Sequence, residues 1–580
     1  MPDVLLIQPP IRDFYLTAKR TIPYGLASIA SALERDGFSV RIIDALATPK
    51  AQTIRLPREM GYLKEFYPTA DISPFSLFHQ FKHFGYGFEQ IGELARESGA
   101  VLIGISSLFT AYSDEAIETA EAVKRKCPGA AVVLGGHHPT ELPGEVLRHE
   151  CVDYVIRGEG EAALPRLARA LTGRLPLEDV PGIGFRMPDG GIFVNPPAVI
   201  QDLDAVASPA VELIDSVFYR RKGKPSAVIV SSRGCPLRCS YCSVGGAAWS
   251  RFRLKSTDTV MRELELAVFD FGARFIDFED ENISFERKWF LSLLGRIKER
   301  FAGYGLELRA MNGLFPPTLD EEVVRAMKEA GFTALNLSLC TTCAAQLKRF
   351  RRPDVRESFE NAVRLAGKYR LECVGYIIVG APEQDAEESL ADLLYLLPMK
   401  VLAGVSVFYP APGSSDFEKC RERGLLPDRF SLMRATALPI TDTTTRLEAA
   451  TLLRLGRVVN FMKTLSAGEM REVAGGAGTL ARPAFGVSGS ELGRNMEGGS
   501  RKREHEPGQP KPSEKSVVDC LPGGHIRGGR REIGKVLLGM FVRDGIIRGV
   551  KPDGEIFEHL ASRELCMKFR EMILGMQYHP

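Results

Sequence analysis

The stretch RGCPLRCSYCS, residues 233–243, sets three cysteines, Cys235, Cys239 and Cys242, at a CxxxCxxC spacing. It follows an apolar run, residues 227–231, that is typical of a β-strand. Three thiolates on one loop can hold one metal centre, and soft sulfur ligands suit an iron–sulfur cluster or zinc. Structural zinc takes four ligands, and this loop has no fourth Cys or His. The pattern therefore favours a 4Fe–4S cluster with one open iron, with structural zinc or three buried thiols as the alternatives.

Strands and helices are predicted to alternate on both sides of this loop. The predicted strands are 227–231, 275–279, 306–310, 334–339, 372–379 and 404–408. Amphipathic helices fall between them, for example at 257–271 and 319–330. Six such units predict a partial or full β/α barrel over residues 226–425, with its active site at the carboxyl ends of the strands.

The N-terminal part shows the same alternation. Predicted strands at 4–7, 40–43, 101–106, 131–134 and 154–156 are separated by helices. Residues 1–172 are therefore predicted to form a doubly wound, Rossmann-like α/β domain, which binds ligands beyond the carboxyl ends of its strands. The aromatic-rich stretch 50–90 is interpreted as an inserted segment or lid. Residues 173–225 are predicted to be a connector with a hairpin turning at Asp189-Gly190.

The last third of the chain changes in composition. Residues 426–473 are predicted to be a helical extension, and 474–532 a flexible linker rich in Gly, Pro and charge. Apolar periodicity returns afterwards, so residues 533–580 are predicted to be a small C-terminal subdomain.

Composition limits the classes of function. The 580 residues carry 75 basic and 73 acidic side chains, a formal charge of +2, which excludes bulk electrostatic attraction to nucleic acid or membrane as the main activity. No apolar run reaches 18 residues, and the first residues lack a signal peptide. We therefore expect a cytoplasmic protein with no membrane span and no nucleic-acid partner. Eleven cysteines in such a compartment favour thiol chemistry or metal binding over disulfides.

With Tyr241 before its last cysteine, the CxxxCxxC loop resembles the signature of radical S-adenosylmethionine (radical SAM) enzymes. The resemblance implies a 4Fe–4S cluster on Cys235, Cys239 and Cys242 whose open iron chelates S-adenosylmethionine. An electron donor such as flavodoxin or ferredoxin would reduce the cluster. Reductive cleavage would then give methionine and a 5′-deoxyadenosyl radical, which takes hydrogen from a small-molecule substrate.

Three further stretches resemble this family. DFEDENISF (277–285) is similar to its second-strand segment, although the usual Gly-Gly-Glu is absent, and YIIVGAPEQ (376–384) is similar to its fifth-strand motif. LSL (337–339) falls where the family places a polar ribose contact. The resemblance assigns S-adenosylmethionine binding to six residues: Tyr241, Glu279, Asp280, Ser338, Ile378 and Gly380. Ordinary barrel packing is the alternative for the strand positions.

The first domain resembles the cobalamin-binding domain found in one subfamily of these enzymes. The similar stretches are GISSL (104–108), LGGHHPT (134–140) and RGEGE (157–161). They assign cobalamin contacts to six residues: Ser106, Ser107, Gly135, Gly136, Gly158 and Glu159. Glycines there would let the backbone approach a flat ligand closely. The Asp-x-His-x-x-Gly motif is absent, and His137 and His138 are interpreted as exposed loop residues, with a role for one of them as a ligand as the alternative. A degenerate domain that no longer binds cobalamin is the alternative.

These features together predict a cobalamin-dependent radical SAM methyltransferase that acts on an unactivated carbon of a small, hydrophobic metabolite. Cyclisation, rearrangement or oxidation without methylation is the alternative reaction, and a non-catalytic cobalamin or redox sensor is the alternative of another class. The substrate, the axial ligand, the oligomeric state and the role of Cys340 and Cys343 stay open. Both cofactors must reach one carbon, so Ser106, Gly135 and Gly158 are predicted to face the cysteine loop across one cavity.

Replacing Cys235, Cys239 and Cys242 with alanine should abolish reductive cleavage of S-adenosylmethionine, because the cluster loses its thiolate ligands. The measurement is 5′-deoxyadenosine release by the anaerobically reconstituted protein. Full release by the triple variant would contradict the cluster assignment.

Overall fold

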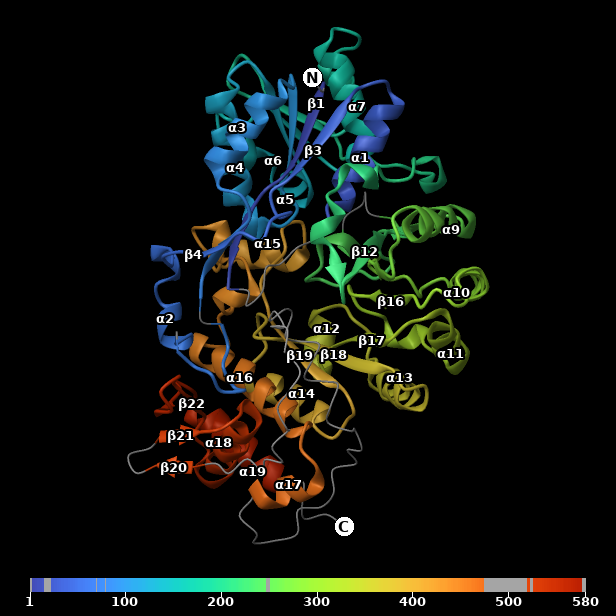
Figure 1. The fold of residues 1–580 in the computed structure, drawn as a ribbon. Helices are drawn as coiled ribbons and strands as arrows, with labels where there is room; N and C mark the ends of the chain where they lie inside the picture. The colour runs from blue at the N-terminus through green and yellow to red at the C-terminus, as the bar shows by residue number, and fades with distance from the viewer. Residues whose placement is uncertain are drawn as a thin grey trace, which may run out of the picture.

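The computed structural model describes residues 3–14, 22–68, 70–78, 80–246, 251–473, 519–521 and 525–575. Most of the predicted linker, residues 474–518 and 522–524, lies outside them. Figure 1 shows the N-terminal domain at one end of the molecule, a β/α domain beside the middle and the C-terminal helices at the other end. Among the described residues, no helix has the length and apolar character needed to cross a bilayer.

The N-terminal domain is built on a seven-stranded sheet of order β10-β9-β8-β7-β6-β1-β3. The strands β3 (Val40–Asp44), β1 (Val4–Gln8), β6 (Leu102–Ser106), β7 (Ala131–Gly135) and β8 (Tyr154–Ile156) are parallel. A hairpin, β9 (Ile183–Arg186) and β10 (Ile192–Val194), adds two antiparallel strands beside β8. The hairpin predicted around Asp189-Gly190 is therefore confirmed, and it extends this sheet from within the predicted connector.

Helices cover both faces of the sheet, as a doubly wound fold requires. α3 (Phe88–Ser98) and α4 (Ser113–Lys126) pack on one face, and α1 (Tyr24–Arg35) and α7 (Gly160–Leu171) on the other. Successive side chains of β1 lie on opposite faces of the sheet, so Leu5 belongs to one apolar core and Leu6 to the other. This alternation is the strand period of two, and it confirms the predicted Rossmann-like class.

The second domain is a partial β/α barrel of six parallel strands. β12 (Lys224–Ile229), β15 (Phe275–Phe278) and β16 (Glu307–Ala310) form one sheet, and β17 (Ala334–Cys340), β18 (Glu372–Val379) and β19 (Leu402–Val407) another. Two isolated bridges connect the sheets: Leu308 of β16 pairs with Phe332, just before β17, and Leu314, just after β16, pairs with Leu337 of β17. Within the described residues β12 and β19 do not pair, so the predicted barrel is partial rather than full. Its outer helices are α9 (Thr257–Glu265), α10 (Arg287–Arg300), α11 (Glu321–Ala330), α13 (Arg356–Lys368) and α14 (Ala386–Leu396).

The aromatic-rich segment 50–90 is packed rather than free. It contributes β4 (Ala51–Thr53), β5 (Lys82–Phe84) and a short helix, α2 (Leu63–Phe66), and β5 pairs with both β4 and β2 (Ile11–Asp13). Its buried side chains form an apolar cluster with Ala449 and Ala450 of α16 (Arg446–Met462). The segment therefore connects the N-terminal domain to the helices that follow the barrel.

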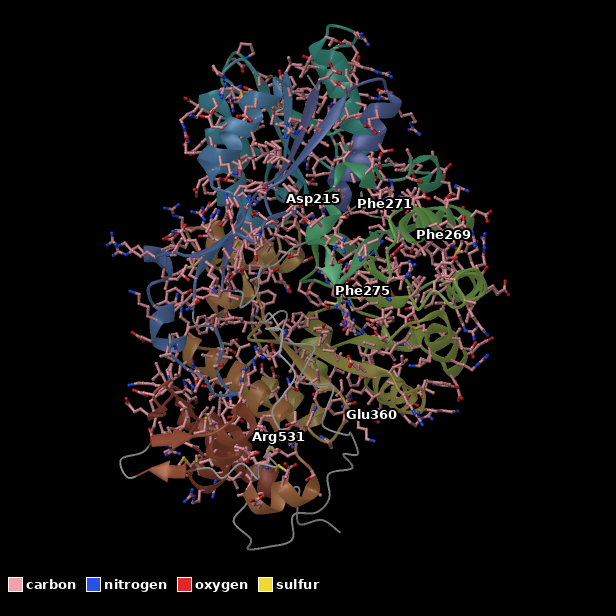
Figure 2. All side chains as sticks on the ribbon, viewed as in Figure 1. Asp215, Phe269, Phe271, Phe275, Glu360 and Arg531 are labelled. Carbon is pink, nitrogen blue, oxygen red and sulfur yellow. The ribbon has the colours of Figure 1, made fainter. Side chains whose placement is uncertain are left out.

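The C-terminal helices α18 (Arg530–Asp544) and α19 (Arg563–Gly575) share one apolar core with the barrel strands. Arg531, labelled in Figure 2, forms an ion pair with Glu469 of α17 (Ala467–Val473) at 2.9 Å. Asp71 reaches this part of the chain as well. Its carboxylate lies 2.9 Å from His559 Nε2 and also accepts a hydrogen bond from the backbone N–H of Val550. Both members of the Asp71–His559 pair are buried.

Replacing Asp71 with alanine should lower the free energy of unfolding by about 3 kcal/mol, because it removes one partner of a buried pair and leaves a backbone N–H unsatisfied. Thermal denaturation and limited proteolysis of the C-terminal helices measure the loss. Asp428→Ala, at an exposed position, is the matched control. Equal stability of the two variants would show that the pair does not hold this region.

Candidate functional site

A cavity of about 730 Å³ lies between the two domains. The N-terminal domain lines it with strand ends and the loops after them: Gln8, Ser106, Gly135, Gly136, Gly158 and Glu159. The barrel lines it with Val228, Arg233, Gly234, Ser243, Glu279 and Glu281. Ser106, Gly135 and Gly158 therefore share one cavity with Gly234 and Ser243, which flank the cysteine loop, although Cys235, Cys239 and Cys242 are not among the residues that line it. The domains meet there with β12 toward the first sheet (Figure 1).

Two hydrogen bonds of Ser240 hold the cysteine loop in place. The Ser240 hydroxyl donates to Asp416 at 2.8 Å, and the Ser240 N–H donates to the Phe350 carbonyl at 3.0 Å. Cys239 is buried, whereas Cys235 and Cys242 are half-buried. Burial, followed by the nearby Cys242 and Cys239, raises the pKa of Cys235 to about 11.

Three thiols on one loop at a strand end, two of them half-buried, are a donor set that fits a cluster with one accessible face. Among the described residues, no group of three or more His, Cys, Asp or Glu could hold a single metal ion. A four-iron cluster is wider than one ion and separates its thiolates further.

Of the acidic residues that follow β15, one supports the cysteine loop and two line the cavity. Asp280 is buried and accepts hydrogen bonds from the Ser231 N–H and from the hydroxyls of Ser231 and Ser232, which precede the cysteine loop. Its carboxylate therefore supports the loop and does not line the cavity. Glu279 lines the cavity, and so does Glu281, which was not predicted.

Alternate residues of an extended chain point to the same side, and this period of two, applied from Glu279, would have found Glu281. The Glu281 side chain is open to the cavity. Protein nevertheless encloses the carboxyl on most sides, and this desolvation raises its pKa to about 7.

The other residues assigned to S-adenosylmethionine lie away from the lining of this cavity. Tyr241 packs edge-on against Phe350 with ring centroids 4.8 Å apart, and both belong with Ile378 to one apolar cluster. The Ser338 hydroxyl and carbonyl each accept a hydrogen bond from Arg352 at 2.9 Å. Gly380 follows β18 with a φ of +70°, and a Cβ there would lie 3.2 Å from Pro439.

The glycines on the first domain differ in what surrounds them. A Cβ on Gly135 would meet nothing within 4 Å, so its backbone is open toward the cavity. Gly136 has a φ of +120°, and a Cβ there would lie 2.7 Å from the Ser107 carbonyl oxygen. Gly158 also has a positive φ, of +81°. Gly135 thus leaves room for a flat ligand, whereas Gly136 and Gly158 shape the loops beside it.

The serines and histidines nearby are placed differently from one another. Ser106 lines the cavity, whereas Ser107 is buried and its N–H donates to the Gly135 carbonyl at 2.7 Å. The interpretation of both histidines as exposed loop residues is wrong, because they begin α5 (His137–Glu141). His138 is buried against Phe430, and burial lowers its pKa to about 4. His137 lines the cavity.

Four charged side chains form an interdomain ion-pair network beside the cavity. Glu159, from the loop before α7, lies 3.1 Å from Arg233 and 3.0 Å from Arg253. Glu161, in the first turn of α7, also pairs with Arg233 and accepts a hydrogen bond from Ser28. The two arginines stand before and after the cysteine loop. Glu159, assigned to cobalamin by resemblance, is therefore held by both arginines while it lines the cavity.

Comparisons with known proteins agree with this architecture. Residues 229–394 match the family model of the radical SAM superfamily, and residues 70–168 match that of the B12 binding domain. The chain is 26% identical to an uncharacterized methyltransferase of Pyrococcus horikoshii, over 73% of this chain and 84% of that protein. It is also 26% identical to hopanoid C-3 methylase of Methylococcus capsulatus, over 69% of this chain and 68% of that protein.

Two solved structures have a similar fold. The methyltransferase TsrM of Kitasatospora setae, with cobalamin and a [4Fe-4S] cluster bound, superposes with a TM-score of 0.55 at 19% identity, covering 73% of this chain and 78% of TsrM. The apo form of the cobalamin-dependent enzyme OxsB superposes with a TM-score of 0.57 at 14% identity, covering 83% of this chain and 69% of OxsB.

Replacing Arg233 with methionine should lower the free energy of unfolding by about 3–5 kcal/mol, because it leaves the Glu161 carboxylate buried without its cation. Arg169→Met, which breaks a surface pair with Asp36, should cost less than about 1 kcal/mol. Thermal denaturation of both variants measures the difference. If they melt together, the network does not hold the domains.

Proposed function

We propose that this chain, a radical S-adenosylmethionine enzyme with a B12-binding domain, transfers a methyl group by way of cobalamin to an unactivated carbon of a small molecule. One observation carries the proposal: the strand ends of both domains line one cavity. Transfer between two bound groups requires them to be held within contact distance, and a shared cavity meets that requirement. The relatives that are named as methyltransferases or methylases support methyl transfer as the reaction.

Cys235, Cys239 and Cys242 would hold the cluster at the barrel side of the cavity. On the opposite wall, Ser106 and the open backbone at Gly135 would receive the corrin, with Glu159 beside them. When bound, the cluster supplies the electron that cleaves S-adenosylmethionine, and cobalamin carries the methyl group. A donor such as flavodoxin or ferredoxin in the cytoplasm would provide that electron.

Glu279 and Glu281 would contact the methionine part of S-adenosylmethionine, since both carboxylates line the cavity and its amino group is cationic in solution. Tyr241, Ser338, Ile378 and Gly380 would shape the remainder of that site from behind the loop. Asp280 would act indirectly, by holding Ser231 and Ser232 at the start of the loop.

A hydrophobic substrate is supported by three large side chains that line the cavity while remaining well exposed. Leu108 and Phe109 follow β6, and Tyr409 follows β19 on the barrel side. Exposed apolar side chains that gather at a concave site are typical of a surface that binds an apolar ligand. They would place such a substrate between the two domains.

Replacing Gly135 with leucine should abolish cobalamin binding, because the side chain would occupy space that is open in the free protein. The protein is reconstituted anaerobically, and bound corrin, iron, sulfide and 5′-deoxyadenosine are measured with S-adenosylmethionine and reductant. Loss of corrin with retained iron, sulfide and nucleoside release is expected. Gly129→Leu, at an exposed turn, should bind corrin normally.

Two results would overturn the proposal in different ways. Wild-type protein that binds no corrin would support the degenerate domain. Corrin and nucleoside release without transfer of label from methyl-labelled S-adenosylmethionine to any product of a cell extract would favour radical cyclisation, rearrangement or oxidation.

A further inference from the structure

Arg352 connects the cysteine loop to the barrel through four hydrogen bonds. Its Nη2 donates to the carbonyl and the hydroxyl of Ser338 on β17, both at 2.9 Å. Its Nη1 donates to the Tyr241 hydroxyl at 3.3 Å and to Cys239 Sγ at 3.6 Å. The guanidinium also lies over the Phe315 ring, 5.6 Å from its centroid. One buried cation thus touches a cysteine of the proposed cluster directly.

The charge of Arg352 has no carboxylate partner in the part of the chain that the structure describes, although the side chain is only 8% exposed. Its hydrogen-bond partners are instead the Tyr241 hydroxyl, Cys239 Sγ and the oxygens of Ser338, none of which is a carboxylate. Arg352 Nε has no acceptor among the described residues. A buried cation is costly unless an anion lies beside it.

We propose that Arg352 is a positioning residue that acts through Cys239 and raises the reduction potential of the cluster. The inference rests on the proposed cluster at Cys235, Cys239 and Cys242. A cluster bound by three thiolates is anionic and becomes more so on reduction, so a buried positive charge stabilises the reduced state more than the oxidised one. A hydrogen bond to a ligand sulfur acts in the same direction. Arg352 thereby makes the cluster easier to reduce.

The test is a potentiometric titration of the reconstituted full-length protein, followed by the electron paramagnetic resonance signal of the reduced cluster and carried out without S-adenosylmethionine. Arg352→Gln removes the charge. At any one potential between the two plateaus, the ratio of reduced to oxidised cluster should be about tenfold lower in this variant than in the wild type. For a one-electron couple this equals a midpoint potential that is 59 mV lower. Arg352→Lys keeps the charge and should restore at least half of the shift.

Arg349→Gln is the matched control. Arg349 is close in sequence and pairs with Glu388 at 3.3 Å, and its replacement should leave the potential unchanged. If the Arg352→Gln protein binds a cluster that has the wild-type reduction potential, the inference is wrong and the proposed function is unaffected. Failure of both Arg352 variants to take up a cluster would also overturn the inference, because the residue would then serve assembly. A wild-type protein without a cluster would overturn the proposed function, and the inference with it.

Discussion

The arrangement of the site depends on the buried ion pairs that join Glu159 and Glu161 of the first domain to Arg233 and Arg253 of the second. Removing four charges from water is costly, and their attraction repays that cost only when geometry and hydrogen bonding are good. Such a network therefore contributes position more than stability. Because the two arginines bracket the cysteine loop, the network fixes where the loop stands relative to the strand ends of the first sheet.

Each of the two walls of the cavity is held in shape by residues of its own domain. Asp280 holds Ser231 and Ser232 at the start of the cysteine loop, and Asp416 holds Ser240 within it, so buried acids fix the loop at two points. On the other wall, Gly136 and Gly158 take backbone conformations that favour glycine, and Gly135 at the end of β7 leaves space. A loop fixed by hydrogen bonds on one side and an open backbone on the other suit a site that must hold two groups at a fixed separation.

Local patterns in the sequence were enough to predict the parallel strands, the doubly wound first domain and the position of the cysteine loop after β12, whereas the cavity between the domains was predicted from the two cofactors that the family resemblance implies. Period-two alternation and turn residues act over a few positions and can be recognised in one sequence. Features that depend on distant partners were not predicted. Glu159 pairs with Arg253, 94 residues later. The residue that the sequence assigned to cobalamin therefore also forms an ion pair between the two domains. Arg352 reaches Cys239 across 113 residues. His138 was taken as exposed because its burial comes from Phe430, far along the chain.

The contacts between the segment 50–90 and the residues just before α16 also affect the order in which the protein folds during translation. The hydroxyls of Tyr62 and Tyr67 donate to the carbonyls of Ala437 and Thr436, which are 375 and 369 residues later. At translation rates of roughly 5–20 residues per second, these acceptors leave the ribosome on the order of 20–70 s after the donors. During that interval the first domain can fold while these two hydrogen bonds are still unmade. The contacts between the segment 50–90 and the helices after the barrel therefore form late, after both domains have been synthesised.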